Sequence, residues 1–318
     1  MFIYIMGRPH SGSTILDIVL GNSSAVESVG ELVSGLGRET TGDTCACGAT
    51  IVDCPYWQAV RTAFAAAAPF AWEVARDRSV RHAHVRNLPR TLGARGSAAD
   101  LRFLGEASSC FARAIATVAG KPHVLDSSKE PTRGIMLLRF CPDARVIHLV
   151  RDPRRAVASH YWRFYAYGGY FKFLRRKYHA RSMLVPFMFV AAASWTLGNL
   201  ICELGRRFAP ARVVRVRYED LCAQPAAELR RIGQALDVPL DDLIDKLERD
   251  EPMPIGHNIG GNEIRSDGRV AFRPEKGKAH DLPRWLELLT FAACWPLMLA
   301  YGYRLRPLEQ PVSRPEPG

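Results

Sequence analysis

The sequence predicts an α/β fold in which a P-loop-like, mostly parallel sheet is flanked by helices, built as a single domain with helical insertions. Short apolar runs alternate along the chain with longer segments of helical spacing. A chain of 318 residues with 47% hydrophobic content is long enough to bury one large core. Each apolar run also ends in polar residues or glycine. Because ligands bind at the carboxyl ends of strands in open α/β sheets, we expect these ends to converge on one site.

Four short apolar runs are predicted to be strands: Phe2–Met6, Val124–Asp126, Arg145–Val150 and Val213–Arg217. The first run leads into the turn Gly7–Gly12, after which Ser13–Leu20 has helical spacing. The third run is followed by the turn Arg151–Pro153 and a helix, and the last ends at Tyr218–Asp220. The strand–turn–helix order repeats along the chain, as a parallel sheet requires.

The remaining segments are predicted to decorate this core. Helical insertions are expected at about residues 60–120 and 164–195, and the arginine-rich stretch Arg76–Gly96 suggests an exposed loop or a mobile insertion. The domain is expected to span residues 1–305, and the proline-rich tail 306–318 is predicted to be disordered.

The formal net charge of +11 indicates an anionic ligand, a class that includes nucleotides, sulfated sugars, nucleic acid and membrane surfaces. No basic leader precedes the first glycine turn, and the apolar stretch Leu286–Tyr301 is shorter than the about 20 residues that cross a bilayer. We therefore expect a cytoplasmic protein.

One segment suits peripheral contact with an anionic membrane. Tyr170–Tyr178 interleaves aromatic and basic residues ahead of the apolar run Met183–Ala193. The same residues suit a glycan groove or a solvated helix over the core equally well.

The segment Gly7-Arg8-Pro9-His10-Ser11-Gly12-Ser13-Thr14 has the spacing of a phosphate-binding P-loop, with serine in the lysine position. Backbone N–H groups in such a turn, together with the positive end of the next helix, hold a phosphate whatever the side chains are. The missing lysine would reach the β and γ phosphates, so its absence disfavours triphosphate chemistry. The alternative is an ordinary strand–turn–helix connection.

Four ordered elements resemble those of sulfotransferases that use 3′-phosphoadenosine 5′-phosphosulfate (PAPS), particularly the tyrosylprotein and carbohydrate branches. These elements are Gly7–Thr14 with Val29–Glu31, Asp126–Pro131, Val150–Ser159 and Arg217–Leu221, and the resemblance extends to about Asn262. It implies transfer of a sulfonate from PAPS to a hydroxyl group, with 3′-phosphoadenosine 5′-phosphate (PAP) as product and no metal. It does not choose among carbohydrate, glycolipid, natural-product and tyrosine acceptors.

The resemblance also implies roles for individual residues. Glu31 is expected to take the acceptor's proton, and Lys129 to place a cation near the leaving oxygen. Arg151 and Ser159 are expected to bind the 3′-phosphate. The other residues expected at the donor are Arg8, His10, Ser11, Gly12, Ser13, Thr14, Tyr218, Asn262 and Arg265.

His10 departs from the family pattern, because many relatives have lysine or arginine just before the Ser-Gly of the loop. Arg8 or Lys129 could supply the missing cation, or His10 itself could be protonated, since negative charge raises the pKa of an imidazole. We therefore expect His10 to act in catalysis as well as in donor binding. For Glu31, the structural alternative is a helix cap or a pair with Arg38.

Eight cysteines in a chain of this length do not form a dense disulfide framework. Cys45, Cys47 and Cys54 suggest a zinc site, but a structural zinc ion needs four ligands and a fourth is not evident nearby. We therefore expect a local disulfide or packed thiols, and no metal.

Two other classes of protein stay open. A P-loop kinase for a small molecule would need magnesium ligands, for which Asp126 at a strand end is one candidate. A non-catalytic basic module would bind nucleic acid or anionic lipid without these ordered elements. We favour the transferase, with a hydroxyl-bearing acceptor and no nucleic acid as partner, and the sequence leaves the oligomeric state open.

Overall fold

The computed structural model describes residues 1–93, 98–158, 181–261, 263–272 and 282–305. Its centre is a five-stranded sheet of order β2-β3-β1-β4-β5, in which every pair of neighbouring strands is parallel. The strands are β1 (Phe2–Gly7), β2 (Val26–Ser28), β3 (His123–Lys129), β4 (Ala144–Val150) and β5 (Val213–Arg217). The predicted α/β class is confirmed, and all four predicted strands are present. The short edge strand β2 was not predicted.

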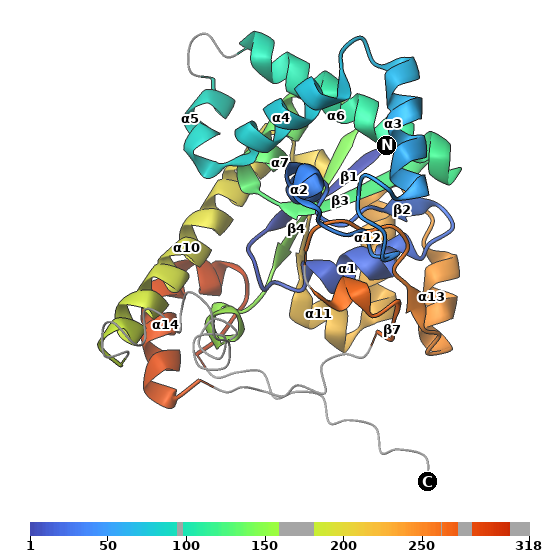
Figure 1. Ribbon diagram of the computed structural model, residues 1–318. Coiled ribbons are helices and arrows are strands. Elements are labelled where there is room, and N and C mark those ends of the chain that lie inside the picture. Colours follow the sequence, from blue (N-terminus) through green and yellow to red (C-terminus); the bar gives the residue numbers. More distant parts are fainter. Residues whose placement is uncertain (94–97, 159–180, 262, 273–281, 306–318) are drawn as a thin grey trace.

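Helices cover both faces of the sheet (Figure 1). One face packs against α2 (Leu32–Arg38), α3 (Pro55–Ala67), α4 (Trp72–Ala83), α6 (Ala98–Ala119) and α7 (Pro131–Phe140). The other face packs against α1 (Ser13–Gly21), α11 (Tyr218–Ala223), α12 (Pro225–Leu236) and α13 (Asp241–Glu248). Because side chains alternate along a strand, Tyr4 of β1 enters the first core and Ile5 the second. A strand buried on both faces therefore needs an unbroken apolar run, as β1 has.

The region predicted as a helical insertion at about residues 60–120 does form helices, including the short α5 (Leu88–Thr91). The exposed loop predicted from Arg76 is wrong for its first part, because α4 continues to Ala83. Trp72, Ala75 and Ser79 recur at helical spacing and are buried. Arg76 of this helix pairs with the buried carboxylate of Glu39, and its Nη1 lies 3.1 Å from Oε1 of Glu39.

Two long helices, α10 (Arg181–Phe208) and α14 (Arg284–Ala300), pack against each other beside the sheet (Figure 1). Trp195 of α10 is 2% exposed and belongs to a small core shared with α14. Within the part of the chain described, the stretch 188–208 of α10 is long and apolar enough to cross a membrane, by length and composition alone. Most of the predicted insertion at 164–195, like the tail 306–318, lies outside the described residues.

A late segment returns to the sheet. Between β6 (Met253–Pro254) and β7 (Arg269–Val270), which pair antiparallel, Ile259 forms an isolated parallel bridge with Gly30. The bridge brings a segment from the end of the chain against the residues that follow β2. The remaining short helices are η1 (Glu39–Thr41), η2 (Val85–Asn87), η3 (Pro210–Arg212) and η4 (Glu263–Ser266).

Candidate active site

A cavity of about 910 Å³ opens at the carboxyl ends of the strands. Gly7 and Lys129 are the last residues of β1 and β3, and Arg151 and Tyr218 directly follow β4 and β5. The expectation that the strand ends converge is therefore confirmed. The predicted site residues that line the cavity are Arg8, His10, Gly12, Ser13, Thr14, Glu31, Lys129, Arg151 and Tyr218.

The predicted phosphate loop connects β1 to α1, which begins at Ser13. His10 and Gly12 both have left-handed backbones, with φ of 67° and 87°. A Cβ at Gly12 would lie 2.2 Å from two carbons of the Tyr218 ring, so only glycine fits there. The loop is thus seated on an aromatic ring from the start of α11, and the N-terminus of α1 faces the cavity.

Arg151 is held against the same loop. Its Nη1 donates to the carbonyl oxygen of His10 at 3.1 Å, and its guanidinium lies 4.7 Å from the centre of the Tyr218 ring. The carbonyl oxygen of Arg151 accepts a hydrogen bond from Nε1 of Trp195 at 3.0 Å. A cation is therefore positioned at the edge of the cavity by β4, α10 and α11. Ser159, its predicted partner at the 3′-phosphate, lies outside the described residues.

Glu31 and Lys129 form an ion pair in the cavity wall. Their side chains are 16% and 15% exposed, so the pair is largely shielded from water. Glu31 precedes α2, but its side chain makes no capping hydrogen bond, and Arg38 pairs instead with Asp43 at 3.3 Å. Both structural alternatives for Glu31 are therefore absent, and the residues expected to act as base and cation lie side by side.

Glu130 and Ser194 are neighbours of the site that sequence reasoning missed. Glu130 lines the cavity, and burial raises the pKa of its carboxyl above the usual range. The guanidinium of Arg8 donates to the hydroxyl of Ser194, a residue of α10. Burial lowers the pKa of the Arg8 guanidinium. Glu130 lies inside the segment that resembles the family, so its position next to Lys129 was the available signal. Ser194 has no such local signal.

The glycine-rich segment after β6 forms part of the cavity wall beside Glu31. The N–H of Glu31 donates to the carbonyl oxygen of Ile259 at 2.8 Å. The N–H of Ile259 donates to the carbonyl oxygen of Val29 at 3.0 Å. A Cβ at Gly260 would lie 2.9 Å from the carbonyl oxygen of Glu31, and Gly261 lines the cavity. The segment therefore packs directly on the residue predicted to be the base.

Two predicted donor-binding residues, Ser11 and Arg265, do not line the cavity. Ser11 is buried and is not among the lining residues. Arg265 points elsewhere, because its guanidinium pairs with Asp43 at 3.0 Å and donates to the carbonyl oxygen of Thr44. Asn262 lies outside the described residues.

Asp126, the candidate magnesium ligand of a kinase, is fully buried and has structural partners. Its Oδ1 accepts hydrogen bonds from the N–H groups of Leu32 and Ser128, at 3.2 and 2.9 Å. Its Oδ2 pairs with Nε of Arg133 at 3.2 Å. The carboxylate therefore anchors α2 and α7 to β3 and does not line the cavity.

Comparison with known proteins adds to this geometry. Residues 3–242 match the family described as "Sulfotransferase family". Carbohydrate sulfotransferase 3 of Homo sapiens is 27% identical over 182 residues, which cover 51% of this chain and 34% of that protein. The chain thus matches about a third of the length of this curated relative.

Among solved structures, the sulfotransferase domain from the curacin biosynthetic pathway aligns over 96% of this chain and 98% of its own, with 16% identity and a TM-score of 0.50. The sulfotransferase domain of the Synechococcus PCC 7002 olefin synthase aligns over 96% and 95%, with 20% identity and a TM-score of 0.47. The first of these supports a common fold.

Proposed function

Because the chain belongs to the sulfotransferase family, we propose that it transfers a sulfonate group from PAPS to a hydroxyl group of an acceptor and releases PAP. The observation that carries the proposal is the meeting of Glu31 and Lys129 in one cavity with a phosphate loop seated on Tyr218. A loop of backbone donors suits the anionic donor, and a carboxylate beside it suits proton removal from a hydroxyl group.

The donor is expected to occupy the cavity between the loop and Arg151. Backbone N–H groups of the loop and the N-terminus of α1 would hold the 5′-phosphosulfate. Arg151 would bind the 3′-phosphate through charge-assisted hydrogen bonds. The contact between Arg151 and the His10 carbonyl supports this arrangement, because it keeps the guanidinium at the cavity edge.

Transfer would proceed by in-line displacement at sulfur. The acceptor oxygen forms a bond to sulfur while the bond from sulfur to the phosphate oxygen breaks, and that oxygen leaves with the electron pair as part of PAP. Glu31 takes the proton of the acceptor hydroxyl. Lys129 turns from Glu31 towards the leaving oxygen as negative charge develops there, which also frees the carboxylate to accept the proton.

The two rival classes lack comparable support. A kinase would need a magnesium ligand, and the Asp126 carboxylate is taken up by Leu32, Ser128 and Arg133. A basic module would need no such cavity.

A thermal-shift panel tests the three classes together. We expect PAP to raise the melting temperature without a metal ion, because binding to the folded state alone stabilises it. A shift with ATP and magnesium only would support the kinase, and the absence of any nucleotide shift would support the module.

We also propose peripheral contact with an anionic membrane through α10 and α14. These helices expose large apolar side chains that are 45–66% accessible: Phe189, Val190, Leu197, Leu200, Trp285, Leu288, Trp295 and Leu299. Exposed apolar residues combined with a net charge of +11 suit a negatively charged interface. The aromatic and basic segment Tyr170–Tyr178 lies outside the described residues, and the cytoplasmic location stays a prediction.

Vesicle flotation at physiological salt tests this contact. The protein should float with vesicles that contain phosphatidylserine and remain at the bottom with phosphatidylcholine alone. Trp295→Ser should weaken flotation, whereas Val74→Ser, which removes an exposed apolar side chain from α4, should not. Failure to float with either vesicle would end this part of the proposal.

A further inference from the structure

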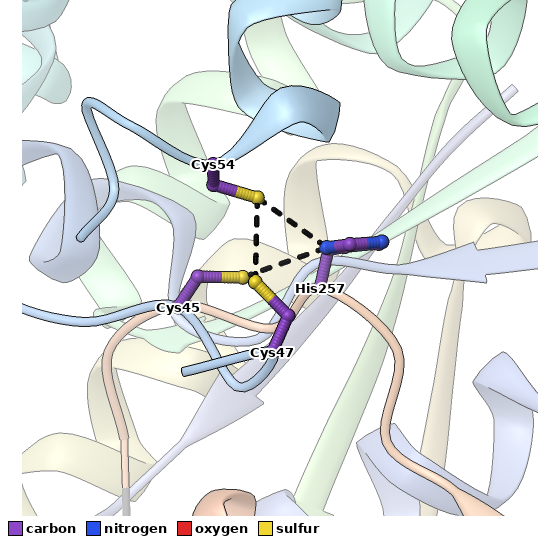
Figure 2. A group of neighbouring side chains, drawn as sticks. All are labelled: Cys45, Cys47, Cys54 and His257. Carbon is purple, nitrogen blue, oxygen red and sulfur yellow. Dashed lines mark hydrogen bonds between the residues drawn. The ribbon is translucent and has the colours of Figure 1, made fainter. Parts of the chain in front are cut away.

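Cys45, Cys47, Cys54 and His257 form a compact cluster away from the cavity (Figure 2). The three Sγ atoms and a ring nitrogen of His257 lie within 4.8 Å of one another. Figure 2 shows the four side chains directed at a common centre. The sequence near the three cysteines offers no fourth ligand, but the fold brings one in from His257, 203 positions after Cys54.

The spacing of these atoms matches a tetrahedral metal site. Sulfur lies about 2.3 Å and imidazole nitrogen about 2.0–2.1 Å from zinc, so the edges of the tetrahedron are about 3.8 Å between sulfurs and about 3.6 Å from sulfur to nitrogen. Cys47 Sγ and Cys54 Sγ are 3.6 Å apart. Nδ1 of His257 is 3.7 Å from Cys45 Sγ and 3.4 Å from Cys54 Sγ.

The same distances do not fit a disulfide. Bonded sulfurs are about 2.05 Å apart, and the eight cysteines, all of which lie within the described residues, are free. Hydrogen bonding between thiols would need only pairs of neighbours. Here four ligand atoms converge, as the closed coordination shell of a structural zinc ion requires.

We propose that Cys45, Cys47, Cys54 and His257 bind a structural Zn²⁺ ion. Three thiolates and one imidazole are a ligand set that favours zinc over the hard cations magnesium and calcium, which prefer oxygen. With four protein ligands, the ion has no open position for a substrate or an activated water, so its role is structural.

The backbone presents the three thiols in advance of binding. Cys45 and Cys47 lie in a tight turn closed by the antiparallel bridge between Thr44 and Thr50. In this turn Gly48, with φ of 93°, donates its N–H to the carbonyl oxygen of Cys45 at 2.9 Å. Cys54 immediately precedes α3, where its N–H donates to the carbonyl oxygen of Thr50. One short connection thus supplies three ligands, and its backbone would lose little conformational freedom on binding a metal ion.

The imidazole of His257 is also fixed from outside the cluster. It stacks on the ring of Tyr56, with centres 4.6 Å apart and planes parallel to within 1°. The backbone carbonyl oxygen of His257 accepts a hydrogen bond from Nε1 of Trp57 at 3.0 Å. Both aromatic residues lie in the first turn of α3, which begins directly after Cys54, so the helix that starts beside one ligand orients another.

A metal ion here would connect two distant parts of the chain, and its effect would extend to the wall of the candidate active site. The residues after His257 include Ile259, whose carbonyl oxygen accepts the N–H of Glu31 at 2.8 Å. Zinc at the cluster would therefore hold the cavity wall that positions Glu31. It would also stabilise the fold, because the unfolded chain does not bring such distant ligands together.

Metal analysis of the purified full chain, prepared without chelators or added metal, tests the site. We expect about one zinc ion per chain by mass spectrometry. Cys47→Ser should abolish zinc binding while the chain still folds, because Cys47 is exposed. Cys222→Ser, which changes a cysteine outside the cluster, should keep the metal.

Two further measurements make the outcome decisive. A chelator should lower the melting temperature of the wild-type protein and leave that of Cys47→Ser unchanged. Refolding with Co²⁺ should give the visible absorption of a tetrahedral cobalt–thiolate centre, and Cys47→Ser should not. The proposal is overturned by protein that contains neither zinc nor a cobalt signature, by another metal in stoichiometric amount, or by an intact mass two hydrogens lower, which indicates a disulfide.

Discussion

The cavity and the Cys45/Cys47/Cys54/His257 cluster stand at the two ends of one segment, His257–Gly261, and are built in opposite ways. Cavity residues face about 910 Å³ of open space and are positioned by contacts with their neighbours, as Gly12 is by the ring of Tyr218. The cluster's ligand atoms face one another within 4.8 Å and leave room for a single ion. The difference suits the two ligands proposed above, the extended nucleotide PAPS at one end of the segment and a single zinc ion at the other.

The comparison also shows how the two sites depend on each other. Ile259, in the middle of the segment, bonds to the backbone of Glu31 and Val29. Changes in the cavity should therefore affect ligand binding and turnover while leaving the metal in place. Loss of the metal should disturb both sites.

Glu31→Gln should give the largest effect. The amide keeps the size of the side chain and can still accept a hydrogen bond from Lys129, but it is no base, so turnover should fall by roughly 10²- to 10⁴-fold. PAPS affinity, melting temperature and zinc content should hardly change. Glu27→Gln, which changes a carboxylate that pairs with Lys121 outside the cavity, is the matched control. A Glu31→Gln variant with near wild-type turnover would remove this residue from the mechanism.

Arg151→Ala should weaken binding of the 3′-phosphorylated nucleotide by roughly 2 kcal/mol or more, as expected for loss of a charge-assisted hydrogen bond. Adenosine 5′-phosphosulfate, which lacks the 3′-phosphate, should lose little affinity. Calorimetry with both ligands provides the comparison. Equal weakening would mean that Arg151 acts only by supporting the loop through the His10 carbonyl.

Gly12→Ala and Gly42→Ala separate backbone strain from the contact with Tyr218. Both glycines have left-handed backbones, with φ of 87° and 79°, but a Cβ at Gly42 meets nothing within 4 Å. The clash with the Tyr218 ring should make Gly12→Ala less stable than Gly42→Ala by about 1–3 kcal/mol in urea unfolding. PAP affinity should fall only in Gly12→Ala. Equal losses of stability would show that the ring moves away without cost.

The smallest expected effect concerns Asp17, which lies beneath the shared segment. Its Oδ2 accepts hydrogen bonds from Ser28 Oγ at 2.6 Å and Asn258 Nδ2 at 2.7 Å. Burial raises the pKa of this carboxyl from 3.8 to about 7. The folded chain therefore keeps a proton that the unfolded chain releases, so stability should fall as the pH rises from 3.8 to about 7.

Asp17→Asn mimics the protonated carboxyl and should remove that pH dependence. Its melting temperature should match the wild type near pH 4 and exceed it by about a few degrees at pH 8. Melting curves across this pH range measure the difference between the two proteins. A constant difference at every pH would contradict the assignment of a raised pKa to Asp17.

Contiguous features of the chain were predictable from the sequence. The parallel sheet follows from apolar runs such as Phe2–Met6, because a strand buried on both faces has no other pattern. The loop predicted to bind phosphate was recognised from glycine spacing within eight residues. The resemblance of four ordered elements to a family singled out Glu31, Lys129 and Arg151. Such features depend on the local backbone, which nearby residues determine.

Tertiary structure alone decided the contacts between distant segments. Glu31 and Lys129 are 98 positions apart and meet only because β3 lies between β1 and β2 in the sheet. His257 reaches Cys54 across 203 positions because Ile259 pairs beside Gly30. The physical reason is that strand order and packing, rather than local propensity, bring such residues together, so local patterns do not record which cysteine, histidine or carboxylate will be a neighbour.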